Sequence, residues 1–376
     1  MTEIRLAIIG IGNCASSLMQ GIEYYKDVEN NDVFIPGLIH PVLGDYKIKD
    51  IKTVIGFDVD KRKINKDVSE AIFAKPNVAT KFKDVPVLNA PVFLGPILDG
   101  VSPHMKTFDK EITFLPEEEQ SPVDVVEKLK EYKVDVVINY LPVGSQKATE
   151  FYAQAAINAG CAFINCMPIF IASNEEWIKK FKEAGLPVLG DDVKSQLGAT
   201  WSHRMAIQSY LDKAIKIDDT TQENYGGNTD FLNMTDPIRI KTKLASKRSS
   251  IEHLVADHPN GKYTIPPVYA GPGTGENNHG FKEGQGDKKT ARIVVHGKGF
   301  GNRPVNMEIN LEVEDSPNSA GIGIDAIRCA KIALDNKVSG SITSPSAFFF
   351  KHPYKKMQDA KAIEMIESFI EGKIER

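Results

Sequence analysis

Lysines and carboxylates occur together in several short stretches of this sequence, and these residue types can stabilise anionic intermediates. The stretches are Gly190-Asp-Asp-Val-Lys-Ser195, Thr242-Lys-Leu-Ala-Ser-Lys247, Gly286-Asp-Lys-Lys289, Glu314-Asp-Ser-Pro-Asn-Ser319 and Ala347-Phe-Phe-Phe-Lys351. Clustered amines stabilise developing oxyanions in a site that excludes water. A lysine crowded by other cations also has a lowered pKa and can act as a base. A single lysine is more often an exposed surface cation, but Lys351 follows three phenylalanines and so lies beside apolar chain.

A glycine-rich turn near the start of the chain has the residues that a dinucleotide-binding loop needs. The turn lies between an apolar, strand-like run at 4–9 and a helix-compatible segment at 13–25. Gly10 permits the tight turn, Gly12 lets a pyrophosphate approach the backbone, and Ala15 allows close packing of helix on strand. Free N–H groups at the helix start then bind an anion. The predicted cofactor contacts here are Gly10, Gly12, Asn13, Cys14 and Ala15.

Asp58 ends a second predicted strand, at 51–57, and indicates which cofactor is bound. A carboxylate at this position binds the ribose 2′-OH of NAD. The separation from Gly12 exceeds the usual ~20 residues, which we attribute to a polar excursion at 27–50. A lysine shortly after Asp58 leaves NADP open, but the acid at the strand end favours NAD.

Asparagines lie next to the last residue of two further predicted strands and are each followed by a proline three residues later. They are Asn139 and Asn165. In open α/β sheets the carboxyl edge of the strands faces the ligand. Asn139 is therefore a candidate cofactor contact, although an ordinary strand-to-helix loop accounts for the same residues equally well.

The remaining pattern predicts an α/β protein with two domains. Strand-like segments at 134–140, 162–166 and 187–189 alternate with helix-like ones at 123–132, 148–159 and 175–184. This alternation predicts a doubly wound Rossmann-type parallel sheet. Beyond residue 200, segments at 292–296 and 305–313 read as antiparallel strands, 257–290 as a mobile loop, and 320–335 and 360–370 as helices. We therefore predict a Rossmann-type NAD-binding domain at 1–199 plus 314–376, and an inserted α+β catalytic and oligomerisation domain at 200–313.

Composition narrows the class of protein. The 376 residues include 41% hydrophobic and 26% charged residues, typical of a globular chain, and a net charge of −4 argues against a general nucleic-acid binder. The four cysteines form no metal-binding or disulfide pattern. The start of the chain reads as a strand, not a signal peptide, and no apolar run is long enough to span a membrane. We expect a soluble cytoplasmic protein with reduced thiols and no membrane or nucleic-acid partner.

The lysine stretches, together with Asn224-Tyr-Gly-Gly-Asn228-Thr-Asp230, resemble the inositol-1-phosphate synthases in their short prokaryotic form. The resemblance runs from Gly10 to Lys351 and is weakest at 257–285. It implies a fold with a Rossmann-type domain, NAD as cofactor, glucose 6-phosphate as substrate and a homotetramer built through the inserted sheet. A monovalent or divalent cation near Asp192 is a further candidate cofactor, and the sequence favours neither type.

The resemblance also implies roles for individual residues. The implied catalytic residues are Lys243, Lys247, Lys289, Lys351, Asp192 and Asp315. The implied substrate contacts are Lys194, Ser195, Asn224 and Asn228 with the same four lysines. The implied cofactor contacts, besides the glycine turn and Asp58, are Asp192, Asn228 and Asp287. Among these, Lys243 is expected to be the base at the C5 hydroxyl, and Lys289 and Lys351 are expected to stabilise oxyanions.

The implied reaction is an isomerisation by an intramolecular lyase. It begins with NAD-dependent oxidation at C5 and continues through loss of a proton at C6 to an enolate. The enolate attacks the C1 aldehyde in an aldol closure, and reduction at C5 completes 1D-myo-inositol 3-phosphate with no net redox change. Each intermediate carries negative oxygen beside a phosphate, which gives the lysines a chemical purpose.

Three alternatives remain open at this point. A net dehydrogenase of the homoserine or semialdehyde type also joins a Rossmann domain to an inserted mixed domain. A non-catalytic NAD-binding sensor or scaffold would have no need of spaced lysines with acidic partners. A related sugar phosphate could replace glucose 6-phosphate, because this chain has Lys194-Ser195-Gln196-Leu197 where longer family members read Lys-Ser-Gly-Gln-Thr.

Overall fold

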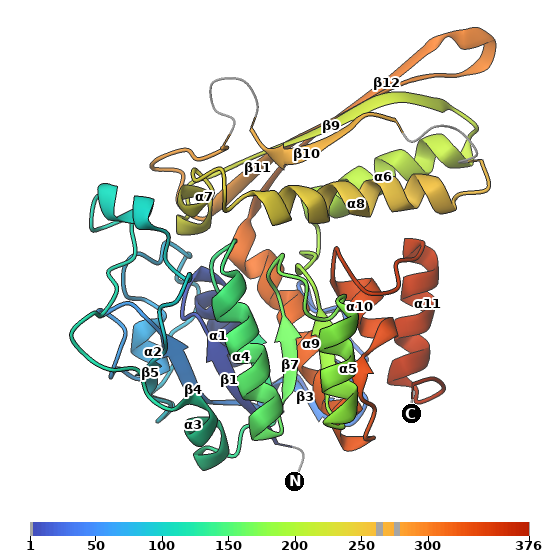
Figure 1. Cartoon of the computed structure of the whole chain (residues 1–376). Helices are drawn as coiled ribbons and strands as arrows, with labels where there is room; N and C mark the ends of the chain where they lie inside the picture. The colour runs from blue at the N-terminus through green and yellow to red at the C-terminus, as the bar shows by residue number, and fades with distance from the viewer. Residues whose placement is uncertain (1–2, 261–265, 274–278, 376) are drawn as a thin grey trace.

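The computed structural model describes residues 3–260, 266–273 and 279–375 and contains two large sheets in separate layers (Figure 1). The larger sheet has seven parallel strands in the order β13-β8-β7-β6-β1-β4-β5. Its strands are β1 Ile4–Ile9, β4 Ile51–Asp58, β5 Val92–Leu94, β6 Val136–Asn139, β7 Ala162–Asn165, β8 Pro187–Gly190 and β13 Gly340–Ser341. Every residue of β6, β7 and β8 is buried, as expected for parallel strands covered on both faces.

Helices cover both faces of the larger sheet. They are α1 Asn13–Tyr24, α2 Val68–Ala71, α3 Val125–Glu131, α4 Gln146–Ala159, α5 Glu175–Glu183, α9 Asp315–Asp335, α10 Thr343–Phe349 and α11 Asp359–Ile370. The alternation of side chains along β1 explains the two layers. Leu6 and Ile8 belong to the core that includes α1 and α9, whereas Ala7 and Ile9 belong to the core that includes α3, α4 and α5. The predicted doubly wound Rossmann-type sheet is confirmed.

The smaller sheet has four strands in the order β10-β9-β11-β12. They are β9 Lys216–Gly226, β10 Val268–Pro272, β11 Lys288–Lys298 and β12 Pro304–Glu314. Helices α6 Ala199–Asp212 and α8 Lys241–Asp257 pack on it, and Tyr210 of α6 and Leu254 of α8 share a core with Val295 of β11. Figure 1 shows these helices, with α7 Thr229–Asn233, between the smaller sheet and the larger one.

Three segments differ from the sequence-based prediction. The excursion at 27–50 contains a hairpin, β2 Val42–Leu43 and β3 Tyr46–Lys47, and the 3-10 turn η1 Ile48–Asp50. The predicted mobile loop at 257–290 contains β10 and the start of β11, because both pair with the long strand β9; its residues 261–265 and 274–278 lie outside the described residues. The helix predicted from residue 320 begins at Asp315, since Asp287 accepts the Ser316 N–H and so caps the first turn.

Two further 3-10 turns are η2 Pro103–Thr107, between β5 and α3, and η4 Phe300–Asn302, between β11 and β12. Within the described part of the chain, no helix is long and apolar enough to cross a bilayer.

Candidate active site

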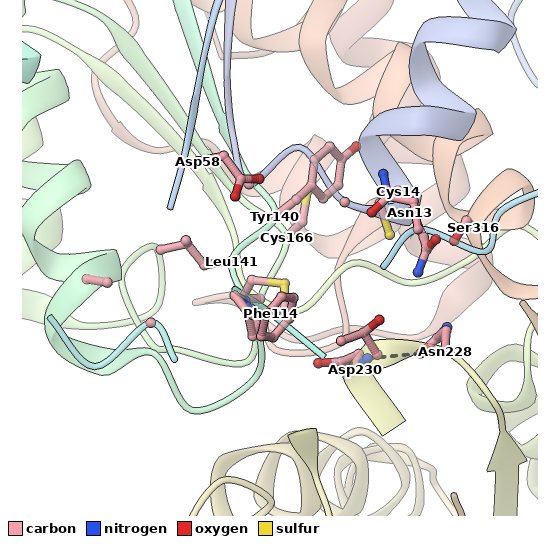
Figure 2. A pocket seen from close by; sticks show the side chains of 18 of the residues that line it. Asn13, Cys14, Asp58, Phe114, Tyr140, Leu141, Cys166, Asn228, Asp230 and Ser316 are labelled. Carbon is pink, nitrogen blue, oxygen red and sulfur yellow. Dashed lines mark hydrogen bonds between the residues drawn. The ribbon is translucent and has the colours of Figure 1, made fainter. Parts of the chain in front are cut away.

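A cleft of about 1290 Å³ opens where β1, β4, β6 and β7 end, and α7 and α8 form its opposite wall. Figure 2 shows Asp58 and Cys166 on one side of it and Asn228 and Asp230 on the other. Residues predicted to bind the cofactor and residues predicted to bind or convert the substrate line the same cleft. They are Gly10, Gly12, Asn13, Cys14, Asp58, Ser195, Asn228, Lys243, Lys289, Asp315 and Lys351.

The glycine turn has the backbone that close approach of an anion requires. Gly10 has φ +83°, and a Cβ there would lie 2.8 Å from the Tyr140 carbonyl oxygen, so only glycine fits. A Cβ at Gly12 would meet no atom within 4 Å, because the backbone there faces open space. The first turn of α1 has no side-chain cap, which leaves its N–H groups available to an anion. Ala15 is fully buried where α1 packs on the sheet.

Asp58 lies at the end of β4 and is held by the turn itself. Its Oδ2 accepts the Ile11 N–H at 2.7 Å, and its Oδ1 accepts the Val59 and Asp60 N–H groups. The buried Lys63 donates to the Ile11 carbonyl oxygen at 2.8 Å, and its Nζ lies 3.9 Å from Asp58. Lys63 also lines the cleft, and no sequence pattern marked it.

Asn139 is not among the residues that line the cleft, so its contact with the cofactor stays a prediction. Its side chain is fully buried and donates to Thr149 and Asn165 at 3.3 and 3.0 Å. Its Oδ1 accepts the Leu141 N–H at 3.1 Å. As the last residue of β6, it faces α4, and the following Tyr140 and Leu141 are the residues that reach the cleft. Asn139 therefore shapes this wall from behind.

Asn13 ties the turn to a neighbouring loop. Its Oδ1 accepts the Val78 and Ala79 N–H groups at 2.7 and 3.0 Å, while the residue also lines the cleft. Cys14 lines the same wall, and burial, followed by the charge of Asp315, raises the pKa of its thiol to about 12. The thiol is therefore neutral at physiological pH.

Asp192 is the centre of a cluster of lysines, in which it contacts Lys243 and Lys351. Its Oδ1 lies 3.3 Å from Lys243 Nζ and 3.0 Å from Lys351 Nζ, and its Oδ2 accepts the Ser246 hydroxyl at 2.7 Å. Burial raises its pKa, but the charges of Lys243 and Lys351 outweigh burial and hold the pKa well below its usual range. The backbone φ of Asp192 is +62°, a conformation that costs a non-glycine residue about 1–3 kcal/mol.

A second carboxylate cluster lies beside the first. Lys289 Nζ is 2.9 Å from Asp315, and both residues line the cleft. Asp287 does not line it; its carboxylate accepts the Ser316 N–H and hydroxyl, and the amide of Asn228 at 3.3 Å. Burial, followed by the charge of Asp315, raises the pKa of Asp287 to about 6. Asp287 thus supports the cleft from behind.

Asn228 closes the opposite wall by capping α7. Its Oδ1 accepts the Asp230 and Phe231 N–H groups at 3.1 and 3.3 Å. Burial raises the pKa of Asp230, whose carboxylate accepts the Val143 N–H at 3.1 Å. The cap and this contact hold α7 against the loop after β6.

A smaller pocket of about 270 Å³ adjoins the cleft and is rich in amines. It is lined by Lys194, Ser195, Asn224, Lys247, Lys289 and Lys351 and by the first turn of α6. The start of α6 at Gly198 has no side-chain cap. Lys289, Lys351 and Ser195 line both spaces, so the pocket and the cleft meet at these residues.

The lysines differ in their readiness to give up a proton. Burial lowers the pKa of Lys351 to about 8, although Asp192 opposes this shift. Burial and the charge of Lys289 lower the pKa of Lys247 well below its ordinary value, and no ion pair among the described residues involves its amine. Burial also lowers the pKa of Lys243, but the charges of Asp192 and Asp230 outweigh burial and raise it. The raised pKa is opposite to what a lysine predicted as the base requires.

Ser246 is a site residue that the sequence analysis missed. It follows Lys243 by three residues and precedes Lys247 by one, so all three lie on one face of α8. The helical spacing was therefore an available signal.

Within the described residues, no group of three or more His, Cys, Asp or Glu side chains could hold a metal ion. The cation near Asp192 therefore stays a prediction.

Comparison with known proteins gives matches over the whole chain. Residues 198–316 match the family model for myo-inositol-1-phosphate synthase. The chain is 45% identical over 370 residues to the inositol-3-phosphate synthase of Mycolicibacterium smegmatis, with 98% of each chain covered, and equally similar to that of Corynebacterium glutamicum. Its structure matches that of a myo-inositol-1-phosphate synthase-related protein from Thermotoga maritima with a TM-score of 0.76, at 26% identity over 98% of both chains.

Proposed function

The chain belongs to the myo-inositol-1-phosphate synthase family, and we propose that it converts D-glucose 6-phosphate into 1D-myo-inositol 3-phosphate with NAD as a recycled cofactor. One observation carries the proposal. Lys243, Lys289 and Lys351 line the same cleft as Gly12 and Asp58. A dehydrogenase-type turn thus shares one space with a cluster of amines suited to anionic sugar intermediates.

The turn and the strand ends fit a dinucleotide. The open backbone at Gly12 and the uncapped start of α1 suit a pyrophosphate, and Asp58 suits an adenosine ribose. Asn13 and Asn228 would complete the walls from either side of the cleft. NAD, when bound, would supply reversible hydride acceptance at C5 of the sugar.

The smaller pocket suits the phosphate of the substrate. The uncapped first turn of α6 offers N–H groups to an anion, and Ser195 offers a hydroxyl. Lys247 has a buried amine with no carboxylate partner among the described residues, so a bound phosphate would supply its missing counter-charge. The sugar would then extend toward Lys289 and Lys351, which line both spaces.

Proton transfer is better assigned to Lys351 than to Lys243. The pKa of Lys351 is lowered to about 8, so a useful fraction of its amine is neutral near physiological pH. The raised pKa of Lys243 keeps this residue cationic, which suits it to stabilise oxygen anions. Asp192 contacts both amines and orients them toward the cleft.

The sugar intermediates develop negative charge where the lysines lie. Proton loss from C6 after oxidation at C5 gives an enolate, and attack on C1 gives an alkoxide. Lys289 and Lys243 can stabilise these oxyanions, while Asp315 holds Lys289 in place at 2.9 Å. The final reduction at C5 returns the hydride to the sugar, so the reaction has no net redox change. The enzyme would then be an isomerase of the intramolecular-lyase type.

We also propose a domain organisation, an oligomeric state and a cellular location for the protein. Residues 1–199 plus 314–376 and residues 200–313 would form two domains, since the two large sheets share no strand. A homotetramer would form through the smaller sheet, whose strand β12 has one edge unpaired within the described residues. Reduced cysteines at all four positions are consistent with the cytoplasm.

Product identification tests the function. The purified protein is incubated with glucose 6-phosphate and a small, catalytic amount of NAD, and the products are identified by NMR. We expect an inositol phosphate to accumulate well beyond the amount of NAD. Net formation of NADH with an oxidised sugar phosphate would instead support a dehydrogenase, and NAD binding without turnover on any sugar phosphate would support a sensor.

A further inference from the structure

An ion-pair chain connects the last helix of the protein to the smaller pocket. Asp359, the first residue of α11, has its Oδ1 3.5 Å from Lys194 Nζ and its Oδ2 2.7 Å from Arg204 Nε. The Lys194 and Arg204 side chains are both less than one-tenth exposed. Lys194 lies more than 150 residues before Asp359 in the chain, so the contact depends on the fold.

The Arg204 side chain bonds to three separate residues of the chain. Its guanidinium donates to the carbonyl oxygens of Ser250 in α8 and Met357 just before α11, in addition to its pair with Asp359. Arg204 itself belongs to α6, whose first turn lines the smaller pocket. One buried guanidinium and one carboxylate therefore connect α6, whose first turn lines the pocket, to the start of α11.

Lys194 depends on Asp359 for its charge as well as its position. Its amine also donates to the Ala347 carbonyl oxygen at 3.3 Å, which is a neutral acceptor. Burial lowers the pKa of Lys194 to about 8, and Asp359 is the largest influence that opposes this shift, while Arg204 and Lys351 add to it. Without the carboxylate, a buried amine among other cations would lose its proton more readily.

We infer that Asp359 is a positioning residue for substrate phosphate, which acts by holding the Lys194 amine charged and in place at the wall of the smaller pocket, with Arg204 as its anchor. The inference rests on the proposed function and deepens it. It assigns to α11 a part in binding the sugar phosphate that is separate from the cleft. A purely structural ion pair is the competing explanation.

The test combines binding with kinetics in the intact protein. Binding of glucose 6-phosphate is measured by calorimetry, and KM and kcat are measured across pH 6.5–9, for wild type, Asp359→Asn and Asp359→Glu. Glu364→Gln is the matched control, because it removes an exposed carboxylate of the same helix. Binding is measured independently of turnover, so failure of the proposed reaction and failure of this inference are distinguishable.

We expect Asp359→Asn to weaken binding about fivefold at pH 8, because a fall of about one unit in the pKa of Lys194, from about 8, reduces the charged fraction of its amine from about one-half to about one-tenth. The pH above which KM rises should move downward, because Lys194 then loses its proton at lower pH. Asp359→Glu should keep the wild-type pH profile even if its KM is higher, and Glu364→Gln should match wild type. In a Lys194→Met background, Asp359→Asn should have little further effect.

Three results would overturn the inference. Asp359→Asn could bind glucose 6-phosphate with wild-type affinity and pH dependence. Its effect could persist undiminished in the Lys194→Met background, which marks a structural ion pair. If Asp359→Asn does not fold, an Asp359→Glu profile shifted to lower pH would show that the carboxylate does not maintain the charge of Lys194.

Discussion

Lys351 and Asp192 are connected twice, once through their side chains and once through their backbones. Lys351 Nζ lies 3.0 Å from Asp192 Oδ1, and the Lys351 N–H donates to the Asp192 carbonyl oxygen at 2.8 Å. The neighbouring Val193 and Phe350 form an isolated antiparallel bridge. Both the backbone and the amine of Lys351 are therefore held in place by Asp192. A fixed amine suits a group that must transfer a proton in a defined direction.

Replacing Lys243 by alanine should lower the rate of turnover about 10²–10³-fold and leave cofactor binding intact. The raised pKa keeps this amine cationic, and loss of one charge that stabilises an oxyanion typically costs about 10²–10³ in rate. Turnover is measured with glucose 6-phosphate, and NAD binding by fluorescence or calorimetry. Lys241→Ala, an exposed lysine two residues earlier on α8, is the matched control. Full activity of Lys243→Ala would remove this residue from the mechanism.

Replacing Asp192 by asparagine should reduce kcat about 100-fold or more, because two amines lose the carboxylate that orients them. Without that charge the pKa of Lys243 should fall, since the field of Asp192 is the largest influence that raises it. The pH–rate profile and the melting temperature are measured together. Asp84→Asn, which removes an exposed ion pair, is the control. A variant with near-normal kcat would argue against Asp192 as the centre of the cluster.

Alanine at the two glycines of the turn should have different effects. Gly12→Ala should fold normally, because its Cβ meets no atom within 4 Å, but should bind NAD at least about tenfold more weakly because the methyl group occupies the anion site. Gly10→Ala should lower the melting temperature, since φ is +83° and its Cβ would contact the Tyr140 carbonyl oxygen at 2.8 Å. Melting curves and NAD titrations separate the two. Unchanged NAD affinity in Gly12→Ala would contradict the assigned pyrophosphate site.

The ratio kcat/KM should rise with pH below about pH 8 and fall with pH above it. The proton acceptor must be neutral, so kcat should rise as pH increases through the pKa of Lys351, about 8. Substrate phosphate needs charged amines, so KM should rise above the pKa of Lys194, also about 8. The ratio kcat/KM should therefore be bell-shaped. A ratio that stays constant between pH 6.5 and 9 would contradict both assignments.

The local sequence signals predicted the parallel sheet well and the smaller sheet less well. β1 was predicted with its observed bounds because an apolar run ends at a glycine turn, a signal contained within a few residues. β10 was missed, since it lies in a segment rich in glycine and proline and is stabilised by pairing with β9, whose paired residues lie 48 positions earlier in the chain. Such pairing leaves little local pattern.

For the site, sequence patterns located residue types better than their surroundings. Lys243 and Lys351 were marked by their motifs, but the carboxylates that make their pKa values differ come from other elements, so the direction of each shift needed the fold. Asn139 was placed correctly at a strand end, yet its side chain turns inward to Thr149 and Asn165. Asp359 had no motif, because its role depends on two partners more than 150 residues away.

The central claim is that oxidation at C5, ring closure and reduction occur in one cleft that the glycine turn shares with the lysines. Glucose 6-phosphate labelled with deuterium at C5 tests it most directly, with NAD present in catalytic amount and the product examined by NMR and mass spectrometry. We predict that the deuterium is retained at the corresponding carbon of the inositol phosphate and that no reduced cofactor accumulates. Loss of deuterium from the product, or its stoichiometric appearance in reduced cofactor, would contradict the account.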